Sequence, residues 1–306
     1  MMKLTYNGVD ITSAVSVRKC YHDMYAAGKS DTLNLRLNDA SSLWDVWSPQ
    51  AGDEIKVDYG NISTGTMFVT STTPRNGEYA ILAMSAPSSG FVPQNKAWQS
   101  IRLLQLGREI AERNGLAFDS YGVTDNLYSY VMQQNEGDLP FLHRLATQEG
   151  CAFIVYNKRL VMYSEAYMEA VPPSEVLSIT NDVDYEYTDR SAAAYGSCVV
   201  SNGQYSGNFV ADSQNSRVYQ TQNVIGTGSA ADAERFAKGL LRAANKDCRS
   251  GYVRTPILSG YAAASTVELR SARAPSWDGA VFLDHIRNDY VTERAKVWFR
   301  KPLEGY

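Results

Sequence analysis

Residues 133–160, QQNEGDLPFLHRLATQEGCAFIVYNKRL, bring together several side chains that can do chemistry. The candidates are Glu136, Asp138, His143, Glu149 and Cys151. These residue types serve in other proteins as acids, bases, metal ligands or nucleophiles. A histidine that a neighbouring carboxylate orients is a common general base. The functional hypothesis is therefore that His143 acts as a base and that Glu136 or Asp138 orients it.

Helical spacing offers a structural interpretation of the same residues, and we favour it. Asp138 is a typical N-cap, and Pro140 stands in the first turn, where its missing N–H costs little. Gly150 stands where such a helix would stop. The expected apolar stripe consists of Phe141, Leu142, Leu145 and Ala146. We expect this helix to leave His143 at the boundary or in solvent, and Glu149 solvated in the last turn.

The rest of the sequence carries no recognised motif for phosphate, serine-hydrolase or zinc chemistry. It contains neither GxGxxG, GxxxxGK(S/T), GxSxG nor HExxH. The three histidines, His22, His143 and His285, lie in different segments, without a recurring ligand spacing. We therefore predict no catalytic residue, no cofactor and no metal site. Carboxylate pairs of the glycosidase type are assembled in space, so the sequence leaves that possibility open.

The four cysteines, Cys20, Cys151, Cys198 and Cys248, are far apart in the sequence and form no CxxC motif. Free cysteine is among the most frequently buried residue types, and disulfides are rare in a reducing cytoplasm. We expect reduced and mostly buried thiols rather than a zinc site or a disulfide framework.

Two charged segments admit both a binding and a structural interpretation. Residues 182–189, DVDYEYTD, are acidic, but a calcium loop would need a central glycine that is missing. We expect an alternating strand there. Close to residue 300, aromatic residues interleave with the basic residues Arg287, Arg294, Lys296, Arg300 and Lys301. This pattern fits either a nucleic-acid patch or an edge strand with a charged outer face.

The composition is that of an ordinary globular protein with a modest charge. The chain has 306 residues, 44% of them hydrophobic and 20% charged, which argues against wholesale disorder. A net charge of −4 gives no broad attraction to nucleic acid or to an anionic membrane. No segment has the apolar length of a membrane span, and the first residues do not form a secretory signal. The 20 tyrosines favour strands and protein interfaces.

Hydrophobic patterning divides the chain into three regions. Residues 1–92 are rich in strand signals: residues 4–11 contain an Asn-Gly hairpin turn, and Leu33, Leu35 and Leu37 alternate with polar residues. Residues 93–170 predict a small α+β module with a helix at 98–115, a strand at 127–134 and the helix described above. A hairpin through Asn157 and Lys158 completes this module.

Residues 171–306 begin with a proline-containing linker, VPPSE at 171–175, and return to strand patterns. They also contain a strongly amphipathic helix at 229–247, which Ser229 can cap. The expected fold class is mainly β with an α+β insertion. We expect three domains: 1–92, 93–170 and 171–306.

The middle region resembles the signature of phage baseplate hub proteins of the late-control protein D family. It is also similar to the hub-like N-terminal part of VgrG, the spike protein of type VI secretion. Gly137 stands where serine is more usual in the family, a change that we expect to be harmless. Weaker similarity extends to residues 31–69, 233–247 and 279–299. The residues that carry the resemblance are Gln134, Asn135, Glu136, Asp138, Phe141, Leu142, Arg144, Leu145 and Gly150.

The resemblance implies a structural hub in a contractile phage tail or a tail-like particle such as an R-type bacteriocin. Two tail-tube-like β-barrels would flank the α+β module, and a homotrimer would join the sixfold tail tube to the threefold central spike. The implied partners are the tail tube protein, the spike protein and other baseplate proteins such as wedge and tape measure proteins. DNA would only pass through the lumen, and no membrane anchor is implied. Assembly would take place in the bacterial cytoplasm.

Two other classes of function stay open from the sequence. One is a tail-tip cell-wall hydrolase, and the other is a receptor or glycan-binding protein of the tail tip. The predicted absence of catalytic residues makes the structural role the favoured hypothesis.

Overall fold

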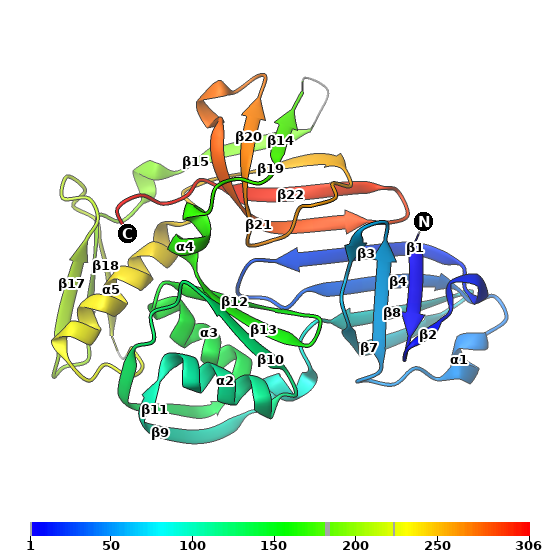
Figure 1. Cartoon of the computed structure of the whole chain (residues 1–306), viewed down its shortest axis with the longest axis horizontal. Helices are drawn as coiled ribbons and strands as arrows, with labels where there is room; N and C mark the ends of the chain where they lie inside the picture. Colours follow the sequence, from blue (N-terminus) through cyan, green and yellow to red (C-terminus); the bar gives the residue numbers. More distant parts are fainter. Residues whose placement is uncertain (1, 181–183, 223) are drawn as a thin grey trace.

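The computed structural model describes residues 2–180, 184–222 and 224–306 of the chain. Figure 1 shows an elongated molecule with β-rich parts at the N-terminal end and along the upper side, and a mixed module below them. Within the described residues, no helix is long and apolar enough to cross a membrane. The expected class, mainly β with an α+β insertion, is confirmed.

The first β-rich part surrounds its own core, as period-two patterning predicts. Leu33, Leu35 and Leu37 are all fully buried in it. The predicted hairpin at 4–11 is present, with Asn7 and Gly8 both at positive φ in its turn. The elements are β1 (Met2–Tyr6), β2 (Val9–Asp10), β3 (Val17–Tyr25), β4 (Thr32–Asn38), α1 (Leu43–Trp47), β5 (Glu54–Tyr59), β6 (Ile62–Ser63), β7 (Met67–Arg75) and β8 (Glu78–Met84).

The mixed module follows a short 3-10 turn, η2 (Ser88–Phe91). Its elements are β9 (Gln94–Arg102), α2 (Leu103–Arg113), β10 (Ala117–Tyr121), β11 (Leu127–Glu136), α3 (Asp138–Gln148), β12 (Cys151–Tyr156), β13 (Arg159–Ser164) and α4 (Glu165–Ala170). The helix predicted at 98–115 starts too early, because Trp98 and Ile101 pair with β11 as part of a strand. The predicted hairpin is present, with Asn157 and Lys158 both at positive φ.

The remaining elements belong to two different packing groups. Helix α5 keeps the predicted position, and Ser229 caps it by accepting a hydrogen bond from the backbone N–H of Asp232. The helix packs on β16, β17 and α3, in the same core as the mixed module. The division into domains at 92 and 170 stays a prediction. The elements are β14 (Val176–Ile179), β15 (Tyr185–Asp189), β16 (Ser197–Ser201), β17 (Ser206–Val210), β18 (Val218–Gln222), α5 (Ala230–Asn245), β19 (Arg249–Pro256), β20 (Thr266–Ser271), η4 (Pro275–Trp277), β21 (Gly279–Asp289) and β22 (Arg294–Arg300).

One sheet runs through the first β-rich part and the C-terminal strands. Its main path is β15-β19-β22-β21-β3-β4-β8-β7-β5-β1-β2. The join is an antiparallel ladder of β21 with β3, in which His285 faces Tyr25 and Asp289 faces Tyr21. Strand β22 lies between β19 and β21, so the interpretation of its basic residues as an edge strand is wrong.

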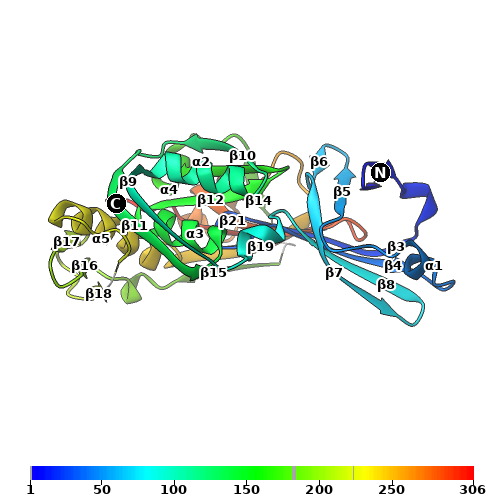
Figure 2. The same ribbon diagram turned by 90° about the horizontal axis from the view of Figure 1, so that it is seen from below.

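The mixed module braces this sheet from one side. Its β12–β13 hairpin reaches the first part, where the backbone N–H of Thr66 donates to Asn157 Oδ1 at 3.2 Å. The Tyr163 hydroxyl donates to the carbonyl of Ala26 at 2.5 Å. Figure 2 shows the first part at one end of the long axis, and α5 with β16–β18 at the other end.

Candidate functional site

Asp138 is a buried anchor, and the prediction that it caps its helix is wrong. Helix α3 begins at Asp138, and the preceding Gly137 occupies the N-cap position without a side-chain cap. The Asp138 carboxylate is fully buried and accepts two hydrogen bonds from Arg113, at 2.9 and 2.5 Å. The side chains of Asn114 and Gln133 donate to it at 2.8 and 3.0 Å. The carboxylate therefore ties α2, β11 and α3 together.

A β-bulge explains the polar residues before this helix. The register of β11 against β9 shifts between Gln133 and Glu136, and Asn135 has a left-handed φ of 45°. The Gln133 amide donates to the carbonyl of Glu136 at 2.7 Å. Gln133 is fully buried, whereas Gln134, the glutamine of the motif, is exposed. Strand alternation could have predicted that Gln133 is buried, because it stands two residues after the buried Val131 and so shares its face of the strand.

Glycine at position 137 permits a close approach of two backbone segments, so the replacement of the family's usual serine by glycine fits this structure. A Cβ atom at this position would lie 2.7 Å from Phe91 Cα and 2.8 Å from the Gly90 carbonyl oxygen. Both atoms belong to the backbone of η2, which cannot move aside as a flexible side chain can. The glycine therefore allows η2 to pack against the start of α3.

His143 and Glu136 line the same cavity, but no hydrogen bond joins them within the described residues. Both line a mainly apolar cavity of about 280 Å³ between the β3–β4 hairpin and α3. The Glu136 carboxylate binds the guanidinium of Arg144 through both of its oxygens. Among the described residues, no hydrogen bond joins His143 to Glu136 or to Asp138. Burial and the nearby Lys246 ammonium lower the pKa of His143, so its ring is neutral at pH 7.

Glu149 and Cys151 also have structural environments. The prediction of a solvated Glu149 is wrong, because only 2% of its side chain is exposed. Its carboxylate accepts hydrogen bonds from Tyr128, Asn126 and Arg235 at 2.5 to 2.9 Å. Burial raises the pKa of the Cys151 thiol to about 12, which is opposite to the requirement of a nucleophile.

All four cysteines are free, and three of them are buried, as predicted from their type and spacing. Burial raises the pKa of the Cys20 thiol to about 12 and that of Cys198 to about 11. The part of the chain that the structure describes holds no group of three or more histidine, cysteine, aspartate or glutamate side chains that could bind a metal ion.

The acidic segment 182–189 is only partly described. Residues 182 and 183 lie outside the described residues, and residues 185–189 form the predicted strand, β15. Asp184 forms an ion pair with Arg254 at 3.2 Å.

The basic residues of β21 and β22 have two different environments. Arg300 is fully buried and binds Glu169 and Asp284, so it is an internal charge and not part of a surface patch. Arg287 on β21 and Lys296 on β22 are direct cross-strand neighbours of each other. Lys296 lies over the ring of Tyr252, with 3.5 Å between its Nζ and the ring centroid.

The sheet face around the β21–β3 join carries two ordered rows of side chains. Arg254, Lys296 and Arg287 are direct partners across three strands and form a cationic row. The next row is aromatic and contains Tyr252, Trp298, His285 and Tyr25. The rings of Tyr25, His285 and Trp298 stack with centroids 4.3 and 4.1 Å apart.

This stacking turns the ring faces toward one another, which removes them as platforms for nucleic-acid bases. A groove of about 710 Å³ lies along the same face. Asp23 accepts hydrogen bonds from His285 at 2.6 Å and from Arg287 at 2.8 Å. These contacts order the polar surface that crosses both β-rich parts, and it is the candidate functional face of the molecule.

Comparison with known proteins supports the same fold. No protein-family model matches the sequence, and no curated protein does so either. The structure is similar to the 43 kDa tail protein of prophage MuSo2 from Shewanella oneidensis, with 12% identity, a TM-score of 0.71 and coverage of 98% of this chain and 96% of that one. A tail protein from Neisseria meningitidis gives 11% identity, a TM-score of 0.75 and coverage of 98% and 95%.

A third similar structure is an Escherichia coli protein described as a component of the type VI secretion system, with structural similarity to bacteriophage T4 tail proteins. It shows 11% identity and a TM-score of 0.63, with coverage of 99% of this chain and 78% of that one. The two tail proteins match almost over their full lengths, so the likeness includes the β-rich parts as well as the module. The chain thus has the fold of phage tail proteins and of a related type VI secretion component.

Proposed function

We propose that the chain is a structural baseplate hub protein of a contractile phage tail or of a tail-like particle. Three copies would form a ring between a sixfold tail tube and a threefold central spike. The observation that carries this proposal is the β21–β3 ladder, which joins two β-rich parts with separate cores in one sheet. Two such parts in each of three chains would supply six β-rich units around one axis.

The proposed partners follow from this arrangement. They are the tail tube protein on the sixfold side, the spike protein on the threefold side, and other baseplate proteins around the ring. DNA would pass through the lumen transiently. The polar sheet face with the row of Arg254, Lys296 and Arg287 suits a lumen filled with water better than a buried subunit contact. The assembled particle would be its location after folding in the bacterial cytoplasm.

An apolar patch on α1 is the proposed surface for contacts with neighbouring subunits. Leu43, Val46 and Trp47 are 57%, 80% and 51% exposed at the far end of the first part (Figure 1). Beneath them, Trp44 is buried and stacks on Tyr79, with 5.7 Å between the ring centroids. Contiguous exposed apolar side chains on a firm base are typical of protein interaction sites.

Native mass spectrometry of the chain, co-expressed with its tube and spike proteins, tests the proposal. The expected complex contains three copies of the 33.9 kDa chain. A chain that stays monomeric in the presence of both partners would contradict a hub role.

A cell-wall zymogram tests the hydrolase alternative separately. Clearing by the wild-type protein, and its loss in a double variant with Glu136→Gln and His143→Ala, would replace the structural role with an enzymatic one. We expect no clearing by either protein, because Glu136 is engaged by Arg144 and no hydrogen bond connects it to His143 in the described part of the chain.

A further inference from the structure

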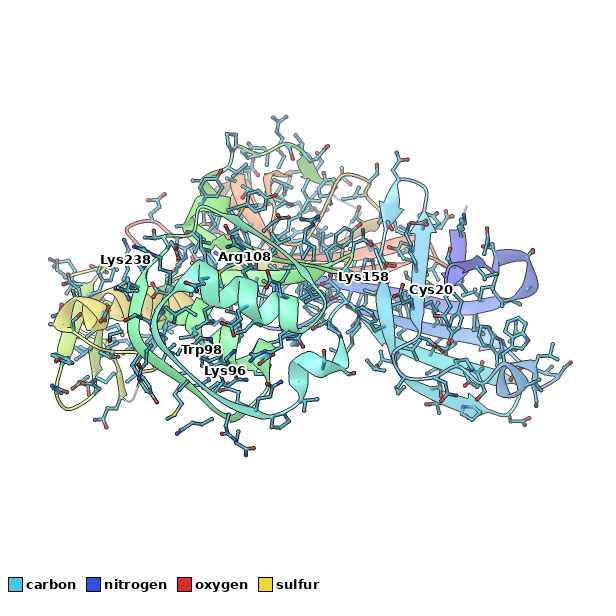
Figure 3. The ribbon with its side chains drawn as sticks, turned by 60° about the horizontal axis from the view of Figure 1, so that its bottom comes forward. Cys20, Lys96, Trp98, Arg108, Lys158 and Lys238 are labelled. Atoms are coloured by element: carbon cyan, nitrogen blue, oxygen red, sulfur yellow. The ribbon has the colours of Figure 1, made fainter. Side chains whose placement is uncertain are left out.

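One face of α5 carries a stripe of three cations. Arg235, Lys238 and Arg242 stand at helical spacings of three and four residues, so they project from the same side of the helix. Like charges at these spacings destabilise an isolated helix. Lys238 is exposed and is labelled in Figure 3, whereas Arg242 is almost fully buried. The stripe therefore runs from solvent into the interior.

The stripe forms one wall of a cavity of about 250 Å³. The opposite side comes from the loop between β10 and β11 and from the end of α3, including Thr124, Asn126 and Gly150. Gly239 fixes α5 against this end: a Cβ atom there would lie 2.2 Å from the Gln148 carbonyl oxygen and 2.5 Å from the Gly150 nitrogen. Because the two backbones touch, the cavity is built by the fold and not by flexible side chains.

The charge that lines this cavity is mainly positive. Among the described lining residues, the charged side chains are the three cations Arg235, Lys238 and Arg242 and the carboxylate of Glu149. Glu149 is already engaged by Tyr128, Asn126 and Arg235. The acidic residues that hold Arg242, Glu165 and Glu169, are not among the lining residues.

Two guanidinium groups at the cavity also have unused donors. Within the described residues, Arg242 Nη1 and Arg235 Nη2 are buried and have no hydrogen-bond partner. Arg242 is only 3% exposed, so solvent cannot readily satisfy this nitrogen. Buried polar groups are almost always paired, so a buried arginine donor beside a cavity is suited to bind an acceptor that enters the cavity.

We propose that this cavity binds an oxyanion, a carboxylate or a phosphate group, between Arg235, Lys238 and Arg242. The group would accept hydrogen bonds from the unused guanidinium donors, while the Lys238 ammonium closes the exposed side. Its source is either a free anion or an acidic side chain of a bound protein. The inference does not depend on the proposed hub role, because it rests only on the cavity of the single chain.

Isothermal titration calorimetry of the full chain tests the proposal with two probes, sodium phosphate and N-acetylglutamate amide, against sodium chloride at matched ionic strength. Saturable binding of phosphate indicates a free anion, and binding of the glutamate probe alone indicates an acidic side chain of a partner. Either result supports the site. Binding of neither probe beyond the chloride control would overturn it.

Variants locate any binding that is found. Lys238→Glu changes an exposed residue and leaves the buried ion pairs of Arg242 in place, so the chain should fold normally. We expect this variant to weaken binding by about tenfold or more, because it replaces a charge that attracts the anion with one that repels it. The matched control is Lys19→Glu, which makes the same change at an exposed lysine of β3. This variant should bind the probes as the wild type does. Equal weakening by both variants would overturn the site and indicate general charge attraction.

Discussion

At the scale of single residues, the chemical candidates of the opening segment serve the fold. Asp138 is held by Arg113, Glu136 by Arg144 and Glu149 by Arg235. A carboxylate that is fully engaged by a guanidinium is not available as a base or as a nucleophile. For the buried carboxylates of Asp138 and Glu149, the cost of burying the charge is offset only while the arginine partner is present.

Replacing Asp138 should therefore destabilise the chain strongly. Asp138→Ala leaves Arg113 and two amide donors without their acceptor in the interior, and we expect a loss of about 3 kcal/mol in the free energy of unfolding. Urea denaturation measures this loss. Glu112→Ala, an exposed acid on the neighbouring helix, is the control and should change stability little. A loss below about 1 kcal/mol for Asp138→Ala would contradict the anchoring role.

His22 gives a second prediction, on the pH dependence of stability. Its ring is fully buried beside Tyr290, and burial lowers the pKa of His22 to about 4. As the pH falls, His22 is protonated near pH 6.5 in the unfolded chain but only near pH 4 in the folded chain. The neutral His22 ring therefore contributes to the free energy of unfolding above pH 6.5. This contribution falls by about 3 kcal/mol as the pH drops from 6.5 to about 4.

Comparison of the wild type with His22→Gln isolates this contribution. The comparison is needed because burial raises the pKa of Asp31 to about 7. Protonation of Asp31 therefore increases the stability of the folded chain as the pH falls, over nearly the same pH range in which His22 decreases it. Denaturant unfolding at pH 7 and pH 4.5 should show a larger loss of stability on acidification for the wild type than for His22→Gln. Equal losses in the two proteins would show that His22 does not titrate in this way.

At the scale of elements, local patterning located most strands and helices but not all of their ends. The alternation of Leu33, Leu35 and Leu37 predicts β4, and the apolar stripe predicts α5. The helix predicted from residue 98 begins at Leu103, because the preceding residues pair with β11. Pairing with a strand about 30 residues away leaves no local signal, and it overrides helix propensity.

The approach of η2 to α3 yields a prediction at this scale. Gly137→Ala places a Cβ atom against the backbone of Phe91, and we expect a loss of about 2 kcal/mol in stability from overpacking. Thermal and urea unfolding both measure the loss. Gly77→Ala is the comparison. A Cβ atom at Gly77 would meet open space, but the residue has a φ of 71°, so we expect this variant to lose about 1 kcal/mol of stability through backbone conformation alone. A smaller effect at Gly137 than at Gly77 would contradict the close approach.

At the scale of the whole molecule, the β21–β3 ladder makes the two β-rich parts mechanically continuous. A buried ion network supports the junction on the side of the module: Arg300 and Arg242 share the carboxylate of Glu169, and Glu169 also accepts the backbone N–H of Leu303. These contacts connect α4, α5 and β22. A molecule joined in this way suits the proposed hub role, in which relative movement of its parts would disturb the proposed ring.

The α1 patch gives the prediction that belongs to this scale. Val46→Lys puts a charge on a side chain that is 80% exposed, so the isolated chain should unfold as the wild type does. In co-expression with tube and spike proteins, we expect the variant to lose the proposed trimer, because burying an unpaired charge opposes association. Native mass spectrometry measures the oligomer. The control is Val291→Lys, at an exposed valine between β21 and β22; loss of the trimer in the control alone would move the interface away from α1.

The sequence by itself determined the class of fold, the positions of most strands and the long helix. Their hydrophobic periods of 2 and 3.6 residues can be recognised from residues that are close together in the sequence. It also indicated the family resemblance through the segment around Asp138. Only the tertiary structure decided what the polar residues of that segment do. The partners of Asp138, Glu149 and Arg300 lie 25, 86 and 131 residues away in the sequence. Such pairs form when distant elements meet, so their spacing in the sequence carries no signal for them.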